Sequence, residues 1–188
     1  MNYCQDEQFD KIDFSKKPLN FEEYDGCTFQ ACDFSNVYLG SVDFINCQFI
    51  NCNMSMAKIG STSFKEVSFT KCKLLGVNFT DSNPFLLSLR FNDCVLDLSN
   101  FYDLPAKKTI FDNCSLKEVD FTQTNLSAAI FRNCDLHMAQ FDRTILEKAD
   151  LRGSVNYQID PSDNRVKGAR FSVDQVLGLL YKYKIKVE

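Results

Sequence analysis

Nine cysteines and one histidine are the side chains in this sequence with the widest chemical repertoire. Cysteine can form disulfides, bind metals or act as a nucleophile. The cysteines recur at intervals of twenty residues, in three sets: Cys94, Cys114 and Cys134; Cys32, Cys52 and Cys72; Cys27 and Cys47. Eight of the nine, all but Cys4, stand two residues before a large apolar residue. A fixed relation to apolar positions is typical of a packing role.

This placement predicts buried, reduced thiols, because a buried free cysteine behaves as a small hydrophobe. Cysteines stacked at this interval could approach disulfide distance, at which the Cα atoms are about 4.4–6.8 Å apart. The N-terminal residues are acidic and contain no apolar run, so no signal peptide is expected. We therefore expect a cytoplasmic protein with free thiols. Pairs spaced CxxxxC, without CxxC or a nearby histidine, disfavour zinc.

No catalytic set emerges from the remaining polar residues. His137 follows Leu136 directly and is expected to point outward. The sequence has no glycine-rich phosphate loop and no HExxH motif. Aspartates recur just before large apolar residues, which places them on an outer wall or at corner hydrogen bonds. We therefore predict a protein that is not an enzyme and that uses no cofactor or metal.

A period of five residues organises the apolar side chains. On an α-helix a step of five turns the chain by about 140°, so these residues would not form a stripe. On a strand, the same step would alternate between the two faces. A chain that turns a corner every five residues buries all of them. The expected core ladder of the second half is Phe91, Leu96, Phe101, Phe111, Leu116, Phe121, Leu126, Phe131, Leu136 and Phe141, with Ala106 in the remaining place.

The twenty-residue interval of the cysteines then implies four sides per coil, with coils stacked about 4.8 Å apart. Segments such as CDFSN, VDFIN, VDFTQ and ADLRG resemble the A(D/N)LXX motif of the pentapeptide-repeat family. The resemblance covers about residues 9–155. It implies an all-β fold, a right-handed quadrilateral β-helix, with any activity on its outer surface.

The repeat divides into two registers within an expected β-helix domain of residues 1–160. One runs over residues 9–79 and the other over 86–151, resuming at Leu86, with a break at 80–90 that contains two extra residues. The break has two interpretations: a bulge that the coil tolerates, or an apolar loop that touches a partner protein. The second makes Asn83, Pro84, Phe85 and Leu87 candidate contact residues.

Residues 161–188 are expected to close the coil with a short capping helix over about 173–183. Ser172 and Gln175 fit the capping box that opens a helix. The segment is similar to the C-terminal end of quinolone-resistance (Qnr-type) pentapeptide proteins, which implies a homodimer formed through this end. A cap without a dimer is the alternative. The expected interface residues are Val176, Leu177, Leu180, Tyr181 and Ile185.

Two functions follow from these patterns. The first is a structural or protein-interaction scaffold whose partner is unknown. The second, implied by resemblance to Qnr- and MfpA-type members, is a DNA mimic that binds DNA gyrase or topoisomerase IV and modulates quinolone sensitivity.

The net charge is −4, and the first 25 residues, with seven acidic and three basic side chains, account for all of it. Because no basic patch appears, direct binding of nucleic acid is not expected, and no apolar stretch is long enough for a membrane span.

Overall fold

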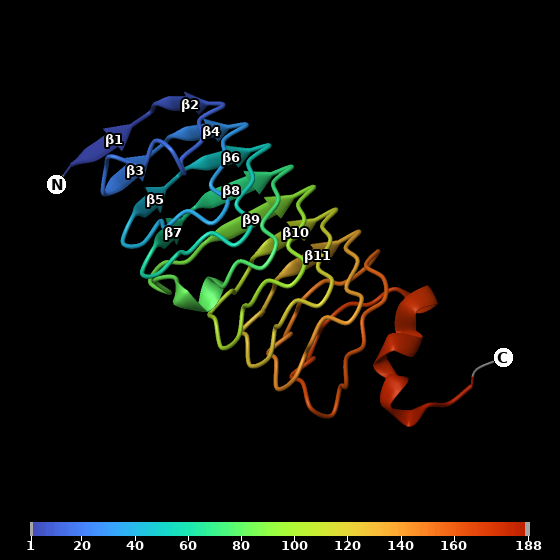
Figure 1. Cartoon of the computed structure of the whole chain (residues 1–188). Coiled ribbons are helices and arrows are strands. Elements are labelled where there is room, and N and C mark those ends of the chain that lie inside the picture. The colour runs from blue at the N-terminus through green and yellow to red at the C-terminus, as the bar shows by residue number, and fades with distance from the viewer. Residues whose placement is uncertain (1, 187–188) are drawn as a thin grey trace.

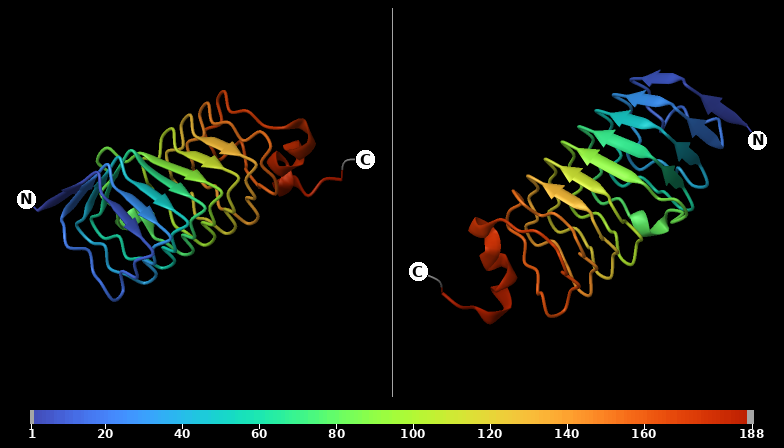
Figure 2. Two further views of the ribbon diagram at one scale, coloured as in Figure 1. Left: turned by 90° about the horizontal axis from the view of Figure 1, so that it is seen from above. Right: turned by 180° about the vertical axis from the view of Figure 1, so that it is seen from behind.

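The computed structural model describes residues 2–186 and shows a right-handed quadrilateral β-helix whose coils stack along one axis (Figure 1). The N-terminus lies at one end of the stack and a short helical segment covers the other (Figure 2). All strand pairs are parallel. One face carries β1 (Tyr3–Gln5), β3 (Glu23–Asp25), β5 (Asp43–Ile45) and β7 (Ser63–Lys65). The adjacent face carries β2 (Gln8–Asp10), β4 (Thr28–Gln30), β6 (Gln48–Ile50), β8 (Val67–Thr70), β9 (Leu89–Asn92), β10 (Ile110–Asp112) and β11 (Ile130–Arg132).

The strand register confirms a coil of twenty residues. Phe29 pairs with Phe49, and Phe91 pairs with Phe111. The one larger step joins β8 to β9, where Phe69 pairs with Phe91, twenty-two residues on. Two extra residues are therefore absorbed within one coil, and the face that carries β2 to β11 continues across the break.

Most five-residue units turn at a left-handed corner two residues after the large inward side chain. Asn51 and Asn113 occupy such corners with φ of 53° and 55°. The aspartate before the inward residue stabilises the turn from its outer side: Asp33 Oδ1 accepts from the Ser35 N–H at 2.8 Å, and Asp120 Oδ1 from the Thr122 N–H at 2.8 Å. This short side-chain bond is the usual reason that Asp and Asn favour turns, and it explains their recurrence here.

The core is a set of stacked aromatic columns. Phe111 lies between Phe91 and Phe131, with ring centroids 5.2 Å and 4.9 Å away. The predicted ladder positions are all buried. At the one place where alanine interrupts the ladder, Leu104 takes the small inward position and Ala106 the large one, and both are buried. The exchange keeps the inward volume of that coil filled.

The register break differs from the prediction at Leu86. Leu86 does not resume the inward ladder: its side chain is 63% exposed and its backbone has φ of 58°, which is the left-handed corner position. The first register therefore continues through Pro84, and the extra residues are Leu87 and Ser88. Leu87 is half-buried and packs against the core. η1 (Phe79–Asp81), a single 3-10 turn, precedes this bulge.

Leu86→Asn is expected to raise the free energy of unfolding by up to about 1 kcal/mol. A left-handed conformation costs an ordinary L-residue about 1–2 kcal/mol, and asparagine adopts it more readily. Thermal unfolding at high salt measures the effect, and Leu87→Asn is the matched control, expected to destabilise because it removes a core contact. A lower midpoint for Leu86→Asn would contradict this account of the corner.

The C-terminal segment is helical, but its details differ from the prediction. It consists of two 3-10 segments, η2 (Val173–Leu179) and η3 (Tyr181–Tyr183). The expected capping box does not form, because the Ser172 hydroxyl accepts from the Gly153 N–H at 2.9 Å instead of capping η2. None of the described helices is long and apolar enough to cross a membrane. Met1 and residues 187–188 of the predicted domains lie outside the described residues.

Candidate functional site

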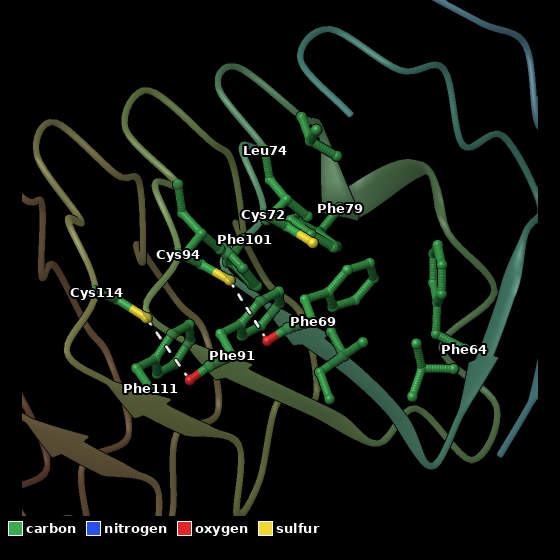
Figure 3. Close-up of a cluster of buried hydrophobic side chains, with 14 of the residues drawn as sticks. Phe64, Phe69, Cys72, Leu74, Phe79, Phe91, Cys94, Phe101, Phe111 and Cys114 are labelled. Carbon is green, nitrogen blue, oxygen red and sulfur yellow. Dashed lines mark hydrogen bonds between the residues drawn. The ribbon is translucent and has the colours of Figure 1, made fainter. Parts of the chain in front are cut away.

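The cysteines form two inward columns. Six of them stack in one column that runs through the register break: Cys32, Cys52, Cys72, Cys94, Cys114 and Cys134. Each thiol donates to the main-chain carbonyl of a phenylalanine in the preceding coil, as Cys94 Sγ does to Phe69 O at 3.4 Å (Figure 3). All nine cysteines are free and buried. Cys4, which lies in the register of the large residues, approaches Cys27 with 3.9 Å between the sulfur atoms.

Hydroxyl groups replace the thiols elsewhere on the coil. Thr124 Oγ1 donates to Phe101 O at 2.7 Å, and Thr144 Oγ1 donates to Phe121 O at 2.8 Å. The small inward position therefore accepts side chains that carry a donor as well as apolar ones such as Val67 and Ala129. A thiol that donates is protonated, and burial raises the pKa of the Cys47 thiol to about 12. Because the thiolate is the reactive form, this geometry assigns the columns to packing.

The other residues with catalytic potential lie apart on the outside. His137 is exposed, and its backbone N–H donates to Asp135 Oδ1 at 3.2 Å. Asp135 also pairs with Lys117, with 3.2 Å between Nζ and Oδ2. Within residues 2–186, no three His, Cys, Asp or Glu side chains gather in a way that could hold a metal ion. These side chains stabilise turns and neighbouring coils.

The predicted contact loop protrudes from the face that carries β1. Phe85 is 66% exposed and Pro84 is also exposed, whereas Leu87 turns toward the core. Asn83 is partly buried: its Nδ2 donates to Ser63 Oγ at 3.2 Å, and its Oδ1 accepts from the Phe85 N–H at 3.0 Å. The exposed apolar tip is therefore Phe85 with Leu86. The prediction placed Leu86 inside because hydrophobicity alone cannot distinguish a corner from a ladder position.

The cap is fixed to the last coils by a few specific contacts. The Ile159 N–H donates to Gly178 O at 3.0 Å, and Lys182 Nζ lies 2.6 Å from Asp160 Oδ2. That contact holds the pKa of the Asp160 carboxyl at about 2. Leu179 packs on the core beneath.

The predicted interface residues line the outside of this cap. Leu177 is 50% exposed and Ile185 is 56% exposed, while Leu180 is half-buried. Val176 and Tyr181 are exposed as well. Val173, which the prediction did not include, is the most exposed apolar residue of the cap; it opens η2 and faces away from the coils. Neither 3-10 segment contains a buried residue.

One of the two faces without regular strands is acidic. We call it the fourth face; its inward residues include Phe79, Phe101, Phe121 and Phe141. Between residues 79 and 163 its outward side chains include Asp81, Asp103, Asp120, Asp142, Asp160 and Asp163, against Arg143. The Asp163 carboxylate beside Asp142 raises the pKa of the latter. Folding thus collects acidic side chains that are dispersed in the sequence.

The fold defines a β-solenoid whose axis is filled by its own side chains, so its contacts with other molecules must be made on the outer surface. The sequence matches the pentapeptide repeat region over residues 22–84 and 86–157. The chain therefore belongs to the pentapeptide-repeat family, which confirms the prediction. The two matched segments are separated at residue 85, inside the bulge.

Several solved structures are similar to this chain. A trypsin-treated form of QnrB1, a plasmid-mediated fluoroquinolone resistance protein, is 20% identical, with 100% of this chain and 99% of that chain covered and a TM-score of 0.49. Full-length QnrB1 is 19% identical, with coverage of 97% and 100% and a TM-score of 0.45. HetL, a pentapeptide repeat protein involved in heterocyst differentiation regulation in Nostoc sp. strain PCC 7120, is 15% identical, with coverage of 90% and 84% and a TM-score of 0.42. The comparison with curated proteins gave no match.

Proposed function

We propose that this protein is a non-enzymatic interaction scaffold that presents exposed apolar residues from a rigid coil. The observation that carries the proposal is the contrast between interior and surface. The thiols and inward hydroxyls are committed to packing, while Phe85, Leu86 and the outer residues of the cap are exposed. Clustered apolar side chains on a protein surface are a common mark of interaction sites.

The cap supports homodimer formation. Val176, Leu177, Tyr181 and Ile185 are all exposed on η2, η3 and the residues that follow. A two-fold contact between two caps would bury these side chains against their own copies and remove apolar surface from water. The same contact would cover Val173.

Leu177→Asp combined with Ile185→Asp is expected to convert this dimer to a monomer, because the charges would have to be buried at the contact. Light scattering at about 1 M salt, where exposed charges are screened, should then report half the wild-type mass. Met56→Asp is the matched control: Met56 is 54% exposed on a coil far from the cap, so its variant should keep the dimeric mass. A monomeric wild type, or an unchanged mass in the double variant, would exclude the cap as the interface.

The contact role of the loop can be tested by placing a photo-crosslinking residue at position 85 in the full chain in cells. A discrete adduct is expected there. The control position is Gln123, a corner residue of the fourth face with φ of 59°. If position 85 gives no adduct, or only the adducts seen at position 123, the loop is not a contact surface.

A second candidate function is inhibition or protection of DNA gyrase or topoisomerase IV by mimicry of a DNA duplex. The acidic fourth face favours it, and so does the similarity of the C-terminal segment to Qnr-type proteins. The charge density of the fourth face argues against mimicry. This face carries about one aspartate per coil, with coils about 4.8 Å apart, whereas a DNA duplex carries one phosphate charge per about 1.7 Å. The scaffold is therefore the first proposal.

A supercoiling assay with gyrase, with and without ciprofloxacin, distinguishes the two functions. Mimicry predicts inhibition or drug protection at micromolar protein, and a weaker effect when Asp81, Asp103 and Asp142 are replaced with asparagine. Replacement of Asp10, Asp112 and Asp150 with asparagine, on the face that carries β2, is the matched control. No inhibition and no protection by the wild-type protein would exclude mimicry and leave the scaffold proposal standing.

A further inference from the structure

The face that carries β1, β3, β5 and β7, which we call the β1 face, is charged with opposite signs at its two ends. It continues beyond β7 through the loop at Phe85 to the coils near the cap. Over the first four coils its outward side chains are six acidic and one basic: Asp6, Glu22, Glu23, Asp25, Asp43, Glu66 and Lys65. Over the last four coils they are five basic and one acidic: Lys107, Lys108, Lys148, Arg165, Lys167 and Glu147.

The two exceptions to this separation are neutralised within the chain. Lys65 Nζ lies 3.5 Å from Asp43 Oδ2, and Arg165 Nη2 lies 2.7 Å from Glu147 Oε1. Among residues 2–186, the other charged side chains of the β1 face form no ion pair. What remains is an acidic end and a basic end whose other charged side chains form no ion pair within the described part of the chain.

The exposed apolar residues lie between these ends. Phe85 and Leu86 belong to the middle coil of the β1 face, with four coils on each side. Both side chains are exposed, at 66% and 63%, so two large apolar groups stand next to each other in solvent at one corner. Apolar side chains that adjoin on a surface and are surrounded by polar ones are typical of a contact site.

We propose that the β1 face binds the β1 face of a second copy of the chain, antiparallel, about a two-fold axis at Phe85. A two-fold contact brings the same patch of both copies together. Phe85 and Leu86 of one copy then meet their equivalents at the centre. The acidic end around Glu23 meets the basic end around Lys148 of the other copy, and Asp6 meets Lys167, on both sides of the axis.

The charge pattern also selects the orientation. A parallel arrangement would place acidic end on acidic end and basic end on basic end, and repulsion would disfavour it. When the contact through the cap is removed, the antiparallel arrangement closes at two copies, because each copy has a single β1 face. Exposed charges attract each other weakly in water, so this pairing is expected to be reversible and sensitive to salt.

A charge-swap experiment tests the pairing. It uses the full chain with Leu177→Asp and Ile185→Asp, which removes any contact through the cap. One variant carries Asp6→Lys and Glu23→Lys; the other carries Lys148→Glu and Lys167→Glu. In the antiparallel pair of either variant alone, each substituted side chain faces a side chain of the same sign. In a mixture, the substituted positions of one variant face those of the other with opposite sign.

Sedimentation should show a reversible dimer for the unswapped chain at about 0.01 M salt, where the Debye length is about 30 Å, and a monomer at about 1 M, where it is about 3 Å. Each swapped variant should be monomeric alone, and their equimolar mixture should dimerise again, which also shows that both are folded. A mixture that stays monomeric, or single variants that still dimerise, would overturn the proposal.

This inference rests on the proposed contact role of the loop, and the photo-crosslink at position 85 separates the two. An adduct of twice the chain mass, lost in either swapped variant and restored in their mixture, supports the second copy as the occupant. An adduct with another protein, and none of twice the mass, would support the contact role and overturn self-association. No adduct at all would overturn both.

Discussion

Phe111→Ala is expected to lower the free energy of unfolding by about 3–5 kcal/mol, the usual cost of removing a large buried aromatic side chain. Phe111 is fully buried, stacked between Phe91 and Phe131. Its ring also contacts Phe101 and Phe121 edge-on, with centroids 6.0 Å and 5.9 Å away. A cavity here would interrupt the column in the middle, where the regular coils above and below cannot close on it.

Two further variants show whether this loss comes from the column. Tyr102→Ala removes a partly exposed aromatic from the outside of a neighbouring coil and should change stability by no more than about 0.5 kcal/mol. Phe9→Ala removes a half-buried ring that stacks on one side only, on Phe29, and should cost less than Phe111→Ala. Equilibrium urea unfolding measures all three. A loss below about 1 kcal/mol for Phe111→Ala would show that the column is not the main source of stability.

Gly178→Ala is expected to detach the cap and to destabilise the chain by about 1–3 kcal/mol, as overpacking of a close contact does. A Cβ at this position would overlap with the Tyr157 carbonyl oxygen, which cannot move away as a side chain can. The same Cβ would lie 2.8 Å and 2.9 Å from Cδ2 and Cε2 of the Tyr157 ring. Gly178 also accepts from the Ile159 N–H through its carbonyl, so the shift would disturb that bond.

Limited proteolysis and the thermal midpoint together report this change. In Gly178→Ala, cleavage within residues 173–186 should become faster, and the midpoint should fall. Gly60→Ala is the matched control, because a Cβ there would meet no atom within 4 Å. Equal protease resistance in the two variants would mean that the close approach at Gly178 does not hold the cap in place.

The interior was predictable because packing alone decides it. A period of five allows only one set of residues to point inward, and the twenty-residue interval of the cysteines sets the number of sides. The structure places Phe91 above Phe111 and Cys94 in one column with Cys114, as these intervals require. The bond from the cysteine thiol to the carbonyl was not predicted, but a signal was present: Ser154 follows Cys134 at the same twenty-residue interval, and its hydroxyl donates to Phe131 O at 3.0 Å.

The register break and the cap were predicted less well, for different physical reasons. Leu86 fits the apolar period, yet an exposed left-handed corner also accepts leucine at a modest cost in free energy, and the sequence does not separate the two. The prediction of a capping box at Ser172 was wrong, because the Ser172 hydroxyl accepts a hydrogen bond from the N–H of Gly153, nineteen positions earlier. Long-range competition of this kind is invisible to a local motif.

The surface was the least predictable part. Beyond residue 25 the acidic and basic side chains of the sequence are equal in number, and the sequence was therefore interpreted as having no basic patch. Coiling sorts the same charges by face and by end, which produces both the acidic fourth face and the two ends of the β1 face. A sum along the chain cannot detect this separation.

The register step at Phe69 and Phe91 has a consequence for how such a molecule can change over generations. One corner holds two residues more than the others, yet β8 and β9 pair in register and the aromatic column is continuous. An insertion at a corner therefore leaves the packed interior unchanged. The length and the side chains of one corner can change while the rest of the coil stays the same. Protein engineers could use the same freedom: the corner at Phe85 is a natural position for grafting a longer recognition loop onto this scaffold.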